Sequence, residues 1–179
     1  MANSGLVRDD SILAVAMLTD EEDCSAHDPE LFNPSSPTYS ATDLNLRCFA
    51  HGESALHPFS RYVRGLLQLR RHPSRLAFLP IAGIPVDLEP APGRTIPWDR
   101  LVGSVSERDP RMVEQVDPSM PNRLVPSCNV PGRGVAFPPI RLLRAAQGLE
   151  AAGARVAVGS ICQDTYAGAL TSLLRALSR

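Results

Sequence analysis

The chain has 179 residues, 44% of them hydrophobic and 21% charged, a composition suited to one globular domain with a buried core. Its formal net charge of -1 argues against the basic surface with which proteins bind nucleic acid or anionic lipid. No apolar stretch approaches the roughly 20 residues that a membrane-spanning helix needs, and no signal-peptide pattern opens the chain. We therefore expect a single domain over residues 1–179 with no transmembrane segment and no nucleic-acid partner, cytoplasmic if expressed as given.

A run of seven apolar residues, 12–18, leads directly into the sequence Thr19-Asp-Glu-Glu-Asp-Cys-Ser. A short apolar run bounded by polar residues is typical of a strand buried on both faces, and open α/β sheets bind ligands beyond the carboxyl ends of such strands. Asp20, Glu21, Glu22 and Asp23 offer the hard oxygen ligands that Mg²⁺ or Ca²⁺ prefers, and clustered carboxylates have raised pKa values without a cation. The alternative interpretation is a solvated acidic turn.

The next part of the chain contains a loop, a helix and a strand. Residues 26–57 are rich in Pro, Ser, Asn and Asp, which predicts a long loop, folded over the end of the first strand. Apolar residues at helical spacing predict a helix over residues 58–71. Residues 76–85 form a second apolar run, in which Pro80 predicts an irregularity because proline cannot donate to a sheet ladder.

Residues 86–138 form a Pro- and Gly-dense insertion, with short helices predicted over 98–102 and 109–116. A helix over 139–152 ending at Gly153, a strand over 154–161 and a helix over 166–177 follow. The alternation of strands and helices predicts an α/β fold, a partial doubly wound, Rossmann-like parallel sheet of about three strands with flanking helices and long Pro-rich insertions.

Four segments together resemble the C-terminal half of a von Willebrand factor A domain, of the bacterial envelope-associated type with long Pro-rich insertions. They are Leu13-Ala-Val-Ala-Met-Leu-Thr-Asp-Glu-Glu-Asp-Cys-Ser, Asp28-Pro-Glu-Leu-Phe-Asn-Pro, Pro126-Ser-Cys-Asn-Val-Pro-Gly-Arg-Gly and Gly159-Ser-Ile-Cys-Gln. The resemblance implies a metal-ion-dependent adhesion site made of an Asp-x-Ser-x-Ser loop after the first strand, a Thr from a second loop, and an Asp after the fourth strand. Only the last has a counterpart here, at Asp20.

The chain departs from this family because it contains no Asp-x-Ser-x-Ser. That loop and the family's central strand are expected upstream of Met1, so the chain resembles a truncated or split domain. Without the central strand, the run at 12–18 becomes a sheet edge with an exposed apolar face, and we expect self-association through it.

The function that the resemblance implies is a non-catalytic, adhesion-type module that binds a protein partner in the cell envelope or outside the cell. Asp20 is its best cation ligand, and Glu21, Glu22 and Asp23 are weaker ones. The alternative is a structural remnant of such a domain that binds no metal.

The four cysteines allow several interpretations. Cys24-Ser-Ala-His27 and Cys48-Phe-Ala-His51 supply the ligand types of a structural zinc site. In an oxidising envelope the even count favours disulfides instead, Cys24 with Cys48 across the Pro-rich loop and Cys128 with Cys162 holding the insertion. Four cysteines allow three pairings, and free buried thiols are a further alternative.

A small hydrolase is the third functional hypothesis, with a Cys or Ser nucleophile and His57 or His72 as base. No local signature such as Gly-x-Ser-x-Gly supports it, and both histidines are expected at the surface beside a helix. Gly132-Arg133-Gly134 is interpreted as a turn, and the single Trp98 as a packing anchor for the insertion.

Overall fold

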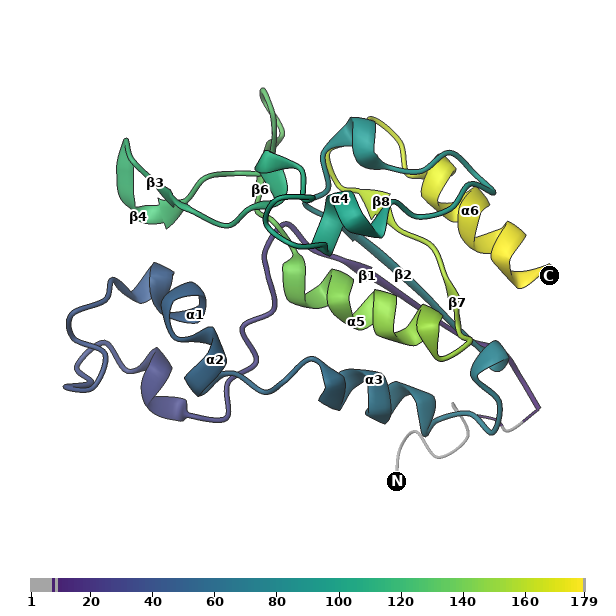
Figure 1. The fold of residues 1–179 in the computed structure, drawn as a ribbon, viewed down its shortest axis with the longest axis horizontal. Helices are drawn as coiled ribbons and strands as arrows, with labels where there is room; N and C mark the ends of the chain where they lie inside the picture. The colour runs from purple at the N-terminus through teal and green to yellow at the C-terminus, as the bar shows by residue number, and fades with distance from the viewer. Residues whose placement is uncertain (1–7, 9, 179) are drawn as a thin grey trace.

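The computed structural model describes residue 8 and residues 10–178, which form an α/β fold around a parallel sheet (Figure 1). The sheet contains β1 (Leu13–Leu18), β2 (Leu76–Ala82), β7 (Arg155–Val156) and β8 (Gly159–Ser160). β2 is central, with β1 on one side and β7 and β8 on the other, and every pairing is parallel. The predicted α/β class and parallel sheet are therefore confirmed.

Pro80 explains why the strand predicted over 154–161 is split into β7 and β8. In β2, Phe78 and Ala82 direct their carbonyls toward this third strand, accepting from the N–H groups of Ala157 at 3.1 Å and Ile161 at 2.8 Å. Pro80 lies midway between them on the same side and has no N–H to donate. The ladder is therefore interrupted beside Pro80, as the sequence predicts.

The helices cover the two faces of the sheet unequally. On one face α3 (Ser60–Leu67) and α5 (Ile140–Ala151) pack against side chains of β1 and β2, which include Leu13, Val15 and Phe78. On the other face α6 (Ala167–Leu177) packs against Ala77, Leu79 and Ile81 of β2. The helices predicted at 139–152 and 166–177 are confirmed within a residue or two, but α3 ends at Leu67, four residues before the predicted end.

β1 is an edge strand and is only half-buried, which corrects the prediction that it is buried on both faces. Its pairing with β2 runs in register from Leu13 with Leu76 to Leu18 with Ile81. Alternate side chains point to opposite faces of a strand, and those of Ala14, Ala16 and Leu18 are exposed because α6 covers β2 and β7 instead. The exposed apolar edge expected from the absence of a further strand is thus present among the described residues.

The 26–57 segment is more ordered than the predicted loop. It contains two single-turn α-helices and two short 3-10 helices, and the 3-10 helices are capped by Asp28 and Asp43, whose side chains accept backbone N–H groups. It packs around its own apolar cluster of Leu31, Tyr39, Ala55 and Leu56. Its elements are η1 (Pro29–Phe32), η2 (Leu44–Leu46), α1 (Arg47–Ala50) and α2 (Gly52–Ala55).

The 86–138 insertion is a packed excursion, and it contains two hairpins that the sequence did not predict. The predicted helix over 98–102 is confirmed as α4, whereas the helix predicted over 109–116 is wrong: only one 3-10 turn follows Asp109 before the chain becomes extended. Its elements are η4 (Val86–Leu88), α4 (Trp98–Val102), η5 (Pro110–Met112), β3 (Val116–Asp117), β4 (Met120–Leu124), β5 (Cys128–Val130) and β6 (Gly134–Ala136). Trp98 packs between two core clusters, and its indole N–H donates to Glu150 at 2.6 Å, which supports its role as an anchor.

Two glycines are required where the chain turns or is closely approached. Gly153 ends α5 at φ +92°, the left-handed conformation that favours glycine. A Cβ on Gly83 would lie 2.0 Å from the Phe137 carbonyl oxygen, so only glycine lets the end of the insertion pass over the end of β2. A short 3-10 helix, η3 (Pro73–Arg75), leads into β2.

No helix within the described part of the chain is long and apolar enough to cross a membrane.

Candidate functional site

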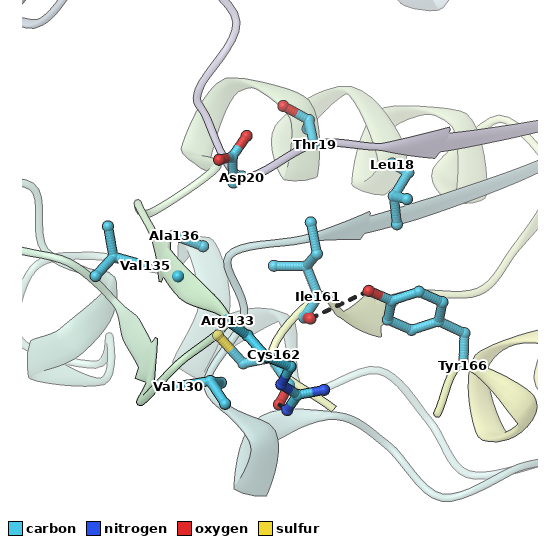
Figure 2. A pocket seen from close by; sticks show the side chains of 11 residues that line it. Leu18, Thr19, Asp20, Val130, Arg133, Val135, Ala136, Ile161, Cys162 and Tyr166 are labelled. Atoms are coloured by element: carbon cyan, nitrogen blue, oxygen red, sulfur yellow. Dashed lines mark hydrogen bonds between the residues drawn. The ribbon is translucent and has the colours of Figure 1, made fainter. Parts of the chain in front are cut away.

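A hollow of about 410 Å³ lies beyond the carboxyl end of β1. Three segments line it: the end of β1 with Leu18, Thr19 and Asp20, the β5–β6 hairpin, and the chain after β8 with Cys162 and Tyr166 (Figure 2). The carboxyl ends of parallel strands are where open α/β sheets bind ligands. The sequence-based location of the site therefore coincides with a hollow in the structure.

The backbone at Asp20 is held on both sides. The N–H of Thr19 donates to Ile81 at 3.1 Å, and the carbonyl of Asp20 accepts from Phe137 at 2.9 Å. The Thr19 hydroxyl accepts from the N–H of Glu21 at 3.1 Å, closing a tight turn. The Asp20 side chain is exposed at the rim of the hollow, across from Arg133 and Tyr166 (Figure 2).

Glu22 turns away from Asp20 and caps helix α5. Its carboxylate accepts the backbone N–H groups of Arg141 at 2.6 Å, of Asp23 at 2.8 Å and of Leu142 at 3.4 Å. Pro139, the cap residue by position, makes no side-chain hydrogen bond to the helix, so Glu22 satisfies N–H groups that every helix start leaves unpaired. Burial raises the pKa of Glu22 to about 7, although these N–H groups act in the opposite direction.

Asp23 and Glu21 also serve separate roles. Asp23 forms an ion pair with Arg141 at 3.1 Å, and the same guanidinium donates to the carbonyl of His57. Glu21 lies on the far side of the turn from the hollow, and burial, with a smaller contribution from Asp20, raises its pKa. The four carboxylates do not converge, and within residues 8 and 10–178 no group of three or more His, Cys, Asp and Glu residues could hold a metal ion.

All four cysteines form disulfides in the pairing favoured by the sequence. Cys24 pairs with Cys48, with their Cα atoms 5.6 Å apart, and Cys128 pairs with Cys162 at 6.4 Å. Both alternatives are therefore wrong: the sulfurs that a zinc site needs are oxidised, and no cysteine is free. The Cys128–Cys162 bond attaches the β5–β6 hairpin to the chain after β8 and so closes one side of the hollow.

The histidines proposed as catalytic bases lie away from this hollow. The ring of His57 contacts Arg61 at 2.6 Å and His27 at 5.6 Å between centroids, and partial burial, Arg61 and His27 lower its pKa. His72 is exposed just before η3. Sequence reasoning missed one hydroxyl–imidazole contact, Thr42 to His51 at 3.0 Å, since nothing in the sequence pairs two residues of a presumed loop.

The hairpin turn at Gly132-Arg133-Gly134 supplies the cation of the hollow. Gly132 and Gly134 have φ values of +79° and +149°, so the expected turn is present. Arg133 donates to the carbonyls of Cys162 at 3.1 Å and Gln163 at 3.0 Å and pairs with Asp164 at 3.0 Å. Because these contacts hold Arg133 in place, its charge is a fixed feature of the wall facing Asp20.

A second, wider groove of about 880 Å³ lies between the 26–57 segment, the β3–β4 hairpin and the start of α5. Glu114 and Arg108 line it, and burial raises the pKa of Glu114 and lowers that of Arg108. Sequence reasoning missed this groove because its walls come from segments far apart in the chain, none with a motif of its own.

Comparison of the chain with protein-family models, with curated proteins and with solved structures gave no match. What the structure shows is an α/β fold with a parallel sheet, flanking helices, two disulfides and a hollow at the carboxyl edge of the sheet.

Proposed function

We propose that this chain is a non-catalytic protein-binding module of the von Willebrand factor A type, whose binding site is the hollow beside Asp20. One observation carries the proposal: Asp20 is exposed at the carboxyl end of β1, on the rim of the hollow. The other three acidic residues of the turn have contacts or surroundings of their own, so Asp20 is the carboxylate left to meet a ligand from outside.

A weak divalent-cation site at Asp20 fits the donors that surround it. The Asp20 carboxylate and the Thr19 hydroxyl are hard oxygen donors on consecutive residues. Mg²⁺ commonly keeps several waters and needs only one or two protein carboxylates. A cation held this way has open positions for an acidic group of a partner protein, which is how the module would bind.

The two disulfides support an oxidising compartment, either the cell envelope or the exterior. Disulfides form and persist in such environments and are rare in reducing cytosol. Here the Cys24–Cys48 bond ties the 26–57 segment to the chain just before it, and the Cys128–Cys162 bond ties the β5–β6 hairpin to the chain after β8.

Isothermal titration calorimetry with MgCl₂ and with CaCl₂ tests the proposal on wild type, Asp20→Asn and the control Asp99→Asn. Asp99 is an exposed aspartate in α4, outside the residues that line the hollow. We expect saturable heat for wild type and the control, and its loss in Asp20→Asn. Equal heat in all three proteins would refute a site at Asp20, and no heat in any would favour the metal-free structural remnant.

A further inference from the structure

The hollow beside Asp20 carries opposite charges at its two ends. Among the described residues that line it, Asp20 and Arg133 are the charged ones. Asp20 follows β1, whereas Arg133 lies in the turn of the β5–β6 hairpin, and Figure 2 shows them at opposite ends of the hollow. A ligand that fills this space therefore meets a negative group at one end and a positive group at the other.

The Asp20 carboxylate is free to receive a positive group. It is exposed, and its side chain forms no hydrogen bond or ion pair with any described residue. Glu21 does not line this hollow but interacts electrostatically with Asp20, which adds negative charge at this end. An ammonium group suits such an end because it carries a full positive charge and three N–H donors.

Arg133 keeps donors for a negative group, although it already has partners. A guanidinium has five N–H groups, and three are used here, on the carbonyls of Cys162 at 3.1 Å and Gln163 at 3.0 Å and on Asp164 at 3.0 Å. The Asp164 side chain is 99% exposed and does not line the hollow, so water weakens this ion pair. The remaining N–H groups of Arg133 can donate to a carboxylate inside the hollow.

The hollow is mostly apolar between these two charges. The Tyr166 hydroxyl donates to the Ile161 carbonyl at 3.3 Å, so its oxygen can still accept an N–H. The volume of about 410 Å³ lies within the range of roughly 300–1,000 Å³ that small-molecule sites occupy. A fitting ligand is therefore apolar in its middle part. The aliphatic residues of the lining are Leu18, Val130, Val135, Ala136 and Ile161.

We infer that this hollow binds a short apolar peptide with free ends, its ammonium group at Asp20 and its carboxylate at Arg133. Such a peptide carries opposite charges at its two ends, apolar side chains between them and an amide N–H for Tyr166. A single α-amino acid does not suit the hollow, because its ammonium and carboxylate groups are attached to one carbon and cannot reach opposite ends. The inference goes beyond the protein-binding function proposed above and does not need a cation at Asp20.

Isothermal titration calorimetry in EDTA tests the inference with dileucine and trileucine, each also in an N-acetylated and a C-amidated form. EDTA removes divalent cations, so a metal ion at Asp20 contributes nothing to the heat. We expect saturable binding of at least one free peptide. Blocking either of its ends should weaken binding by about tenfold or more, because a charge-assisted contact is lost. No saturable heat with either length, or equal binding of the blocked forms, would overturn the inference.

Two variants assign the ends of the peptide. Asp20→Asn should bind the free and the acetylated peptide equally but still prefer a free carboxylate, and Arg133→Gln should show the reverse. Asp99→Asn and Arg94→Gln remove exposed charges outside the hollow and should behave as wild type. Loss of both preferences in one variant, or of neither in both, would refute the assignment.

The contacts of Arg133 with the chain after β8 require a check that Arg133→Gln remains folded. An unchanged urea-unfolding midpoint provides it, and unfolding would abolish binding of every peptide rather than the preference at one end. Calorimetry with MgCl₂ alone tests the cation at Asp20, so each of the two proposals can fail without the other.

Discussion

Glu22 links the stability of the fold to pH, because its carboxylate is buried against the start of α5. Replacing it by glutamine keeps a carbonyl oxygen that can accept the N–H of Arg141 and removes the ability to ionise. The neutral amide resembles the protonated acid, since each has one strong acceptor left for the backbone N–H groups. Glu22→Gln therefore compares the ionised and neutral forms of one side chain in one place.

The size and sign of the effect follow from the pKa of Glu22, which burial raises from 4.5 to about 7. One pKa unit corresponds to about 1.4 kcal/mol, so ionising Glu22 in the folded state costs on the order of 3 kcal/mol. Between pH 4.5 and 7 the folded protein holds a proton that the unfolded chain has released. This contribution to stability is therefore complete below pH 4.5 and is lost as pH rises through 7.

Urea unfolding at pH 5 and pH 8, followed by the fluorescence of the single Trp98, measures this effect. We expect wild type to lose about 2.5 kcal/mol of unfolding free energy relative to Glu22→Gln between these pH values. Glu53→Gln, at an exposed position in α2, is the control and should follow wild type. If wild type instead gains stability over Glu22→Gln as pH rises, attraction of the carboxylate to the helix N-terminus outweighs burial, and the reasoning is refuted.

Three further predictions concern two glycines and the second disulfide. Gly83→Ala should lower the unfolding free energy by about 1–3 kcal/mol, because its Cβ would meet the backbone of Phe137. Gly65 lies within α3, and a Cβ added there would meet no neighbouring atom. Gly65→Ala should therefore raise the unfolding free energy by about 0.5–1 kcal/mol, and urea unfolding measures both changes. Replacing Cys128 and Cys162 together by serine should cost roughly 4 kcal/mol for the loop they close. An unchanged melting temperature in this double variant would show that the disulfide does not restrain the unfolded chain.

Much of the fold was predictable because it depends on local patterns. The apolar run that forms β2 and the helical spacing of apolar residues in α5 and α6 are each visible within a dozen consecutive residues. Pro80 also acts locally: its missing N–H interrupts the ladder wherever the strand is placed. The hairpins at 116–124 and 128–136 escaped prediction because their strands are two to five residues long, too short for a periodic signal.

The candidate site was predictable in place but not in composition. An acidic turn that directly follows an apolar strand lies at the carboxyl edge of the sheet, whatever the arrangement of the other segments. The role of each carboxylate depends on contacts far along the sequence: Glu22 and Asp23 are bound by Arg141, more than 100 residues away. No local spacing distinguishes these two residues from Asp20, although they have different environments in the folded protein.

The sequence by itself determined the α/β alternation and the acidic turn, because each depends on residue type and short-range order. Only the tertiary structure decided that β1 lies at the edge of the sheet, that the start of α5 binds Glu22, and that the β5–β6 hairpin closes the hollow beside Asp20. These outcomes depend on which distant surfaces pack together. That choice is set by the total burial and hydrogen bonding of the whole chain, and no single segment encodes it.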